Sequence, residues 1–184
     1  MKKIMPVILT VFVGASVIAA GISFSHEPFD VEIIRHSHMV SVSNKKFPEL
    51  KVDHSFTDAK KTYQLRYSLF KQIEDVNSRV TDIRMLYSAF ALSVVLNVTA
   101  DTTNEGNARP FNDNDVKKDF NGDFGTTVLI EKPKSEFAKG YQYMMINFYC
   151  KENYGLVVQS ILFNDMSFLR NENLLEIFYS FKFK

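Results

Sequence analysis

The segment "GYQYMMINFYCKENYGLVVQSILF", residues 140–163, decides the fold class. Two runs rich in branched and aromatic side chains flank the polar break "KENYG" at 151–155, which ends in a glycine. A five-residue connection that contains glycine is typical of the turn in a β-hairpin. We therefore predict two antiparallel strands, one over residues 141–150 and the other over residues 156–164.

The remaining segments predict further strands and the helices that cover them. Residues 62–72 alternate apolar and polar side chains, which is typical of a strand with one covered face. Apolar residues at helical spacing over 83–98 form a wide stripe, which predicts a helix that lies flat on a sheet. The other predicted elements are strands over 31–43 and 126–133, loops over 48–61 and 100–110, a short helix over 111–122 ended by Gly122, and a helix within 169–184 followed by a short tail.

This order of elements predicts an α+β fold, with a mainly antiparallel sheet covered by helices in an α/β sandwich. Strands joined by short turns run antiparallel, and the helices in the middle and at the end of the chain must cover the faces of the sheet. The chain has 184 residues, of which 46% are hydrophobic, so it can bury a substantial core.

The first residues have the layout of a secretory signal peptide. Lys2 and Lys3 form a basic start, and an uncharged apolar run follows up to Ala20. We predict a signal peptide over residues 1–23, cleaved after Ala19, Ala20 or Ser23, and a single domain over residues 27–184. Export would place the protein in the periplasm or outside the cell.

An uncleaved anchor is the alternative for the same segment. The uncharged run over residues 4–26 is long enough to span a bilayer, which takes roughly 20 residues. The two alternatives differ mainly in whether cleavage occurs.

Charge and cysteine content exclude several classes of function. The chain has 22 basic and 21 acidic residues, and loss of Lys2 and Lys3 would leave 20 and 21. No stretch beyond residue 25 is strongly basic, which argues against a nucleic acid partner. The single cysteine, Cys150, cannot form an internal disulfide bond, and its place in an apolar strand predicts a buried, inert thiol.

The last quarter of the chain resembles a known family. The phrases "GYQYMMINFY", "GLVVQSILFND" and "LLEIFYSFKF" within residues 140–184 resemble the hairpin and final helix of the PsbP-like and DcrB-like α/β sandwiches. Those families are small exported or lumenal domains. The resemblance implies an accessory or binding domain rather than an enzyme, and it carries over no catalytic residues.

Two histidines are candidate metal ligands. His36 and His38 lie two residues apart, so on a strand their side chains point to the same face. Neighbouring imidazoles can bind zinc or copper, with His54 or His26 as a third ligand. The alternative is a pair of exposed histidines on an edge strand.

The segment "NDNDVKKDFNGDF" at 112–124 is rich in oxygen ligands, which suggests calcium bound by Asp113, Asp115 and Asp119. The spacing does not match an EF-hand, because Phe124 and Ile130 stand where that loop needs glycine and glutamate. The alternative is a capped, solvated start of a helix, where acidic residues are favourable.

The leading hypothesis is an exported, non-enzymatic accessory or binding domain of the cell envelope that binds a protein partner or a small ligand. The strand over 63–70 and the loop over 101–112 are the expected binding surface. The alternatives are a metal-binding module or metal-dependent enzyme built on His36 and His38, and a membrane-tethered structural component. No catalytic residue and no cofactor are predicted, and membrane contact is expected only if the N-terminal segment is retained.

Overall fold

The structure, a computed structural model, describes residues 22–25, 31–43, 47, 49–74, 83–100 and 108–184. Within these residues, no helix is both long and apolar enough to cross a membrane. The predicted signal peptide lies outside the described residues except for its last two, which begin strand β1 (Ile22–Ser25). Cleavage after Ala19 or Ala20 would leave β1 intact, whereas cleavage after Ser23 would divide it.

The centre of the molecule is an eight-stranded sheet in which every pair of neighbours is antiparallel. The strand order is β3-β4-β5-β9-β8-β7-β6, and β1 pairs with the second half of β5. The strands in addition to β1 are β3 (Val40–Ser41), β4 (His54–Thr57), β5 (Tyr63–Glu74), β6 (Arg109–Pro110), β7 (Phe124–Ile130), β8 (Tyr143–Lys151) and β9 (Gly155–Phe163).

The predicted hairpin at 140–163 is confirmed. Strands β8 and β9 pair along their full length, from Tyr143 opposite Phe163 to Lys151 opposite Gly155. All nine residues of β9 are buried, because this strand lies in the middle of the sheet and both of its faces are covered.

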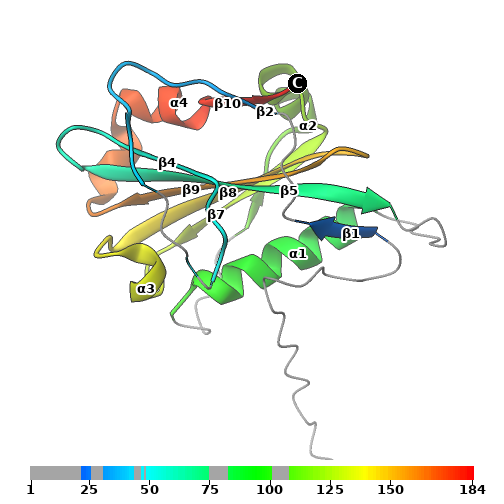
Figure 1. The fold of residues 1–184 in the computed structure, drawn as a ribbon, viewed down its shortest axis with the longest axis horizontal. Coiled ribbons are helices and arrows are strands. Elements are labelled where there is room, and N and C mark those ends of the chain that lie inside the picture. The colour runs from blue at the N-terminus through cyan, green and yellow to red at the C-terminus, as the bar shows by residue number, and fades with distance from the viewer. Residues whose placement is uncertain (1–21, 26–30, 44–46, 48, 75–82, 101–107) are drawn as a thin grey trace, which may run out of the picture.

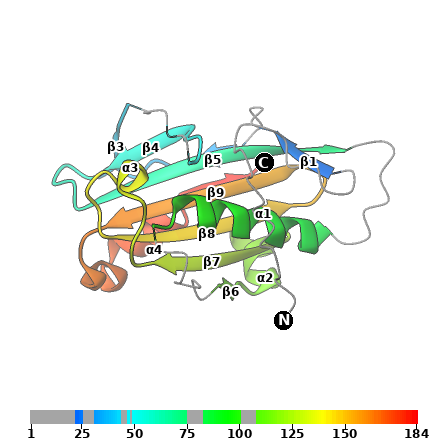
Figure 2. The same ribbon diagram turned by 90° about the horizontal axis from the view of Figure 1, so that it is seen from below.

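Helices and a second small sheet cover the two faces, so the predicted α+β sandwich is confirmed. Helix α1 (Ile83–Val98) lies on one face, and the two-stranded sheet of β2 (Val31–Ile33) and β10 (Phe181–Phe183) lies with α4 (Asn173–Phe178) on the other (Figure 1). Seen from below, α1 runs across the central strands (Figure 2). The remaining helical segments are α2 (Asp113–Asp115), the π-helical turn η1 (Val116–Phe120), α3 (Ser135–Ala138) and the 3-10 helix η2 (Met166–Arg170).

The prediction that only one face of residues 62–72 is covered is wrong. The predicted apolar face, which includes Tyr63 and Leu65, packs under the layer of α4 and β10. The opposite face is also buried, and Arg66 and Ser68 are only 1% and 0% exposed. Because β5 lies inside the sheet between two layers, Arg66, Ser68 and Gln72 are buried together with its apolar residues, whereas Gln64 is half-buried and Lys71 is exposed.

The predicted strand over 31–43 is also wrong, since the segment divides into β2 and β3, which belong to different sheets. Between them the chain turns, and the amide of Met39 donates a hydrogen bond to the carbonyl of His36 at 3.0 Å. Strand β4 lies within the predicted loop 48–61, and β10 replaces the predicted C-terminal tail. Pairing makes these short segments strands, because β4 pairs with β5 across the turn that follows it and β10 pairs with β2 from the other end of the described chain.

The predicted helix over 111–122 is present as α2 followed by η1, and Val116 and Phe120 face inward as expected. Its end differs from the prediction, because Asn121 rather than Gly122 adopts the left-handed conformation, with φ at 56°. Gly122 instead allows a close approach to β8, since a Cβ atom there would lie 3.0 Å from the carbonyl oxygen of Cys150. Asp75, Ser78 and Thr81, the residues before α1 whose side chains could cap its start, lie outside the described residues.

Candidate binding site

Helix α1 presents apolar side chains on its outer side as well as toward the sheet. Its inner side packs on the sheet as predicted, and no charged residue follows Arg84 within the helix. On the outer side, Met85, Leu92 and Leu96 are 71%, 60% and 47% exposed. Exposed apolar side chains that follow one another along a helix often mark a binding surface.

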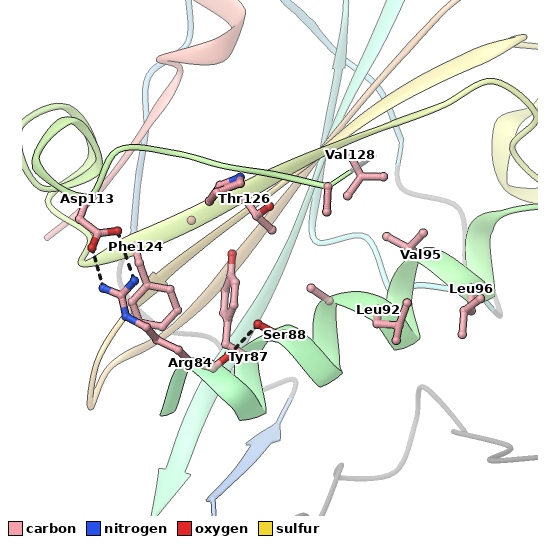
Figure 3. A pocket seen from close by; sticks show the side chains of 14 residues that line it. Arg84, Tyr87, Ser88, Leu92, Val95, Leu96, Asp113, Phe124, Thr126 and Val128 are labelled. Atoms are coloured by element: carbon pink, nitrogen blue, oxygen red, sulfur yellow. Dashed lines mark hydrogen bonds and ion pairs between the residues drawn. The ribbon is translucent and has the colours of Figure 1, made fainter. Parts of the chain in front are cut away.

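A pocket of about 480 Å³ lies between α1 and strands β6 and β7, within the range typical of small-molecule sites. The lining residues come from three segments that are distant in sequence and meet only in the fold (Figure 3). They are Arg84, Tyr87, Ser88, Ala91, Leu92, Val95 and Leu96 from α1, Ala108, Pro110 and Asp113 from the middle segment, and Phe124, Gly125, Thr126 and Val128 from β7.

One end of the pocket is charged. Nη2 of Arg84 donates to Oδ2 of Asp113 at 2.7 Å, and the two side chains are about half exposed. The guanidinium of Arg84 also lies over the ring of Phe124, with 4.6 Å between its central carbon and the ring centroid. Stacking on an aromatic ring orients the planar guanidinium at this end of the pocket (Figure 3).

The opposite end of the pocket is apolar. Leu92, Val95 and Leu96 of α1 lie there across from Val128 of β7 (Figure 3). Because Leu92 and Leu96 both line the pocket and are exposed, the apolar outer stripe of α1 continues into the mouth of the pocket. The arrangement suits an elongated molecule with an apolar body and one polar end.

The floor of the pocket is rigid and uncharged. Tyr87 is buried and meets Phe124 edge to face with ring centroids 4.8 Å apart. Burial raises the pKa of Tyr87 well above its ordinary value, so the phenol is neutral. Gly125 allows the tight packing beneath, because a Cβ atom there would lie 2.6 Å from the carbonyl oxygen of Phe148.

The structure places one part of the sequence-predicted binding surface at the pocket and the other part in the interior. Ala108 and Pro110, from the predicted loop 101–112, line the pocket, whereas residues 101–107 lie outside the described residues. The strand over 63–70 is in the interior and offers no such surface. Sequence reasoning missed the α1 and β7 residues, although the charge-free run after Arg84 was a usable signal.

His36 and His38 lie together, and their shared neighbour is Glu176 of α4. The Nδ1 atoms of His36 and His38 are 3.6 and 3.5 Å from the same carboxylate oxygen of Glu176, and the two rings are stacked with centroids 5.9 Å apart. Sequence reasoning named His54 or His26 as the third group, and His26 lies outside the described residues. Metal binding by the histidine pair stays a prediction.

The predicted calcium ligands lie on α2 and η1. Asp113 pairs with Arg84 at the pocket, Asp115 is exposed and Asp119 is half-buried. In the part of the chain that the structure describes, no group of three or more histidine, cysteine, aspartate or glutamate side chains is placed to hold a metal ion.

Cys150 is placed in the core, as the sequence predicts. The side chain is 0% exposed, and burial raises the pKa of the thiol well above its ordinary value. Because the thiolate is the reactive form, we expect a thiol reagent such as 5,5′-dithiobis(2-nitrobenzoate) to label the native protein at least 100-fold more slowly than the urea-unfolded protein. Labelling at the same rate in both states would contradict the burial of Cys150.

Comparison with known proteins gives a fold but no family. No protein-family model matches the chain, and no curated protein matches it. The solution structure of cyanobacterial PsbP (CyanoP) from Synechocystis sp. PCC 6803 is similar, with a TM-score of 0.50 and 12% sequence identity. The similarity covers 91% of this chain and 95% of that chain. The fold is therefore PsbP-like, and the resemblance to DcrB stays a prediction.

Proposed function

We propose that this protein is an exported, non-enzymatic binding domain of the cell envelope that holds a small, largely apolar molecule between α1 and β7. The observation that carries the proposal is the pocket of about 480 Å³ with an apolar end and a charged end. Its concave form favours a small molecule over a protein partner, because protein interfaces are mostly flatter and larger.

The chemistry of the lining supports binding rather than catalysis. The Ser88 hydroxyl donates to the carbonyl of Arg84 at 2.8 Å, and the Thr126 hydroxyl donates to the carbonyl of Arg109 at 3.0 Å. A nucleophilic hydroxyl needs a neighbouring base within hydrogen-bond reach, whereas these two hydroxyls bind backbone carbonyls. The signal-like N-terminal sequence supports export.

A fluorescence titration tests the proposal. The purified protein is titrated with N-phenyl-1-naphthylamine, a neutral dye whose emission rises in apolar surroundings. We expect saturable binding, weakened at least tenfold in the double variant Leu92→Arg, Leu96→Arg, because two charges would enter the apolar end of the pocket. Both leucines are exposed, so the substitutions should leave the fold intact.

Leu175→Arg is the matched control. Leu175 is 64% exposed on α4, on the other side of the sheet, and does not line the pocket. Its variant should bind the dye as the unmodified protein does. The proposal fails if the unmodified protein shows no saturable binding, or if the double variant binds the dye as tightly as the control.

A further inference from the structure

At the charged end of the pocket, the ring of Phe124 holds the cationic side chain of Arg84 in place. Arg84 begins the exposed edge of α1, and its guanidinium lies over Phe124, which itself packs against Tyr87. A guanidinium presents its donors in a planar fork that matches the two oxygens of a carboxylate. The orientation of Arg84 therefore does not depend on Asp113 alone.

The contact between Arg84 and Asp113 is one that a competing anion can replace. Only one of its two hydrogen bonds is short, at 2.7 Å, and the other is 3.5 Å long. The two side chains are 54% and 49% exposed, and ion pairs at such exposure contribute little to stability because water screens them. Asp113 also lies at the exposed start of α2, as the first residue of a short helix that continues into η1.

The charge of the lining favours an anionic ligand once Asp113 is displaced. Asp113 is the acidic residue among those that line the pocket, and Tyr87 stays neutral. Arg84 is the basic residue among those that line the pocket, since Arg109 lies between the lining residues Ala108 and Pro110 and does not line it itself. The geometry and charge together place an anion-binding group at one end and apolar contacts at the other.

We propose that the ligand is an amphipathic carboxylate whose carboxylate group binds Arg84 in place of Asp113, with its hydrocarbon part between Leu96, Val95 and Val128. This inference rests on the proposed function, since it names the chemical class that the same pocket takes. It also assigns Asp113 a role as an internal competitor that fills the anion position when no ligand is bound.

Displacement of N-phenyl-1-naphthylamine by decanoate and by 1-decanol tests the inference, because these two molecules share the chain and differ in the head group. We expect decanoate to displace the dye about tenfold more effectively than decanol at low ionic strength. Arg84→Gln should remove this preference, weakening decanoate more than decanol. Asp113→Asn should act in the opposite direction and strengthen decanoate several-fold more than decanol, because the competitor has lost its charge.

Arg170→Gln is the control, since Arg170 is exposed on η2 and does not line the pocket, and it should keep the tenfold preference. Equal displacement by decanoate and decanol in the unmodified protein overturns the carboxylate assignment while leaving apolar binding in place. A weaker affinity for decanoate in Asp113→Asn overturns the role of Asp113 as competitor. Absence of dye binding overturns the proposed function itself, which is a different result from either of these.

Discussion

Replacing Arg66 with alanine is expected to lower the free energy of unfolding by about 3–5 kcal/mol, the range seen when a large buried side chain is deleted. Arg66 is 1% exposed, and its guanidinium lies against the rings of Phe47 and Phe137, with its central carbon 4.3 and 4.7 Å from their centroids. Burial lowers the pKa of Arg66 to about 10, which still leaves it charged at neutral pH.

The same guanidinium joins three parts of the chain. Nη1 of Arg66 donates to the backbone carbonyl of Phe137 in α3, and Nη2 donates to Oε1 of Gln64 at 2.6 Å. Alanine would leave a cavity beside the rings of Phe47 and Phe137 and a buried carbonyl without its donor, and each of these costs free energy. Arg66→Met keeps most of the volume and should therefore cost less, about 1–3 kcal/mol for the unsatisfied groups.

Urea unfolding followed by circular dichroism measures these differences. Arg170→Ala is the matched control, because this exposed arginine should change the free energy of unfolding by no more than about 0.5 kcal/mol. If Arg66→Ala unfolds at the same urea concentration as Arg170→Ala, the buried guanidinium contributes nothing and the expectation is wrong.

Replacing Gln159 with leucine is expected to cost about 2–4 kcal/mol, although leucine fills a similar volume. Nε2 of Gln159 lies within hydrogen-bond distance of the Tyr67 hydroxyl at 3.0 Å and of the carbonyls of Ile177 and Phe178 at 3.1 Å. Its Oε1 accepts a hydrogen bond from Asn147 at 2.9 Å. Leucine would leave several of these buried groups without partners.

The Gln159→Leu substitution should destabilise most strongly the part of the fold at the far end of this hydrogen-bond network, next to β10. The Tyr67 hydroxyl also contacts the Ser180 hydroxyl at 2.5 Å, so the network ties the middle of the sheet to the segment between α4 and β10. We expect amide hydrogen exchange in β10 to accelerate more than in β8. Gln142→Leu is the control, because Gln142 is exposed and its substitution should change the free energy of unfolding by about 0.5 kcal/mol or less. Unchanged amide hydrogen exchange in β10 would contradict the expectation that the Gln159 network stabilises this strand.

The parts of the fold that the sequence predicts are those with a local pattern. Two runs of branched and aromatic residues around a turn with glycine predict the hairpin of β8 and β9, and helical spacing predicts α1 with its buried side correct. Strands β2, β3 and β10 have only two or three residues each, which is too short for a pattern. Their state depends on partners far along the chain, so local reasoning cannot find it.

The candidate site is harder to predict for the same reason. The pocket is lined by residues within the segments 84–96, 108–113 and 124–128, which come together only in the folded protein. The charge-free stretch after Arg84 indicates that some apolar side chains of α1 do not pack on the sheet. It does not indicate which other segment lies opposite these side chains. Burial of Arg66 could not be predicted either, because an arginine within an alternating strand is normally placed on the solvent side.

The pairing of β10 with β2 has a consequence for biosynthesis. Phe181 and Phe183 are buried, and they pair with Ile33 and Val31 from the opposite part of the sequence. This wall of the core can therefore form only after the ribosome has made the residues up to Phe183. During synthesis of all the intervening residues, the segment that becomes β2 has to wait without its partner strand.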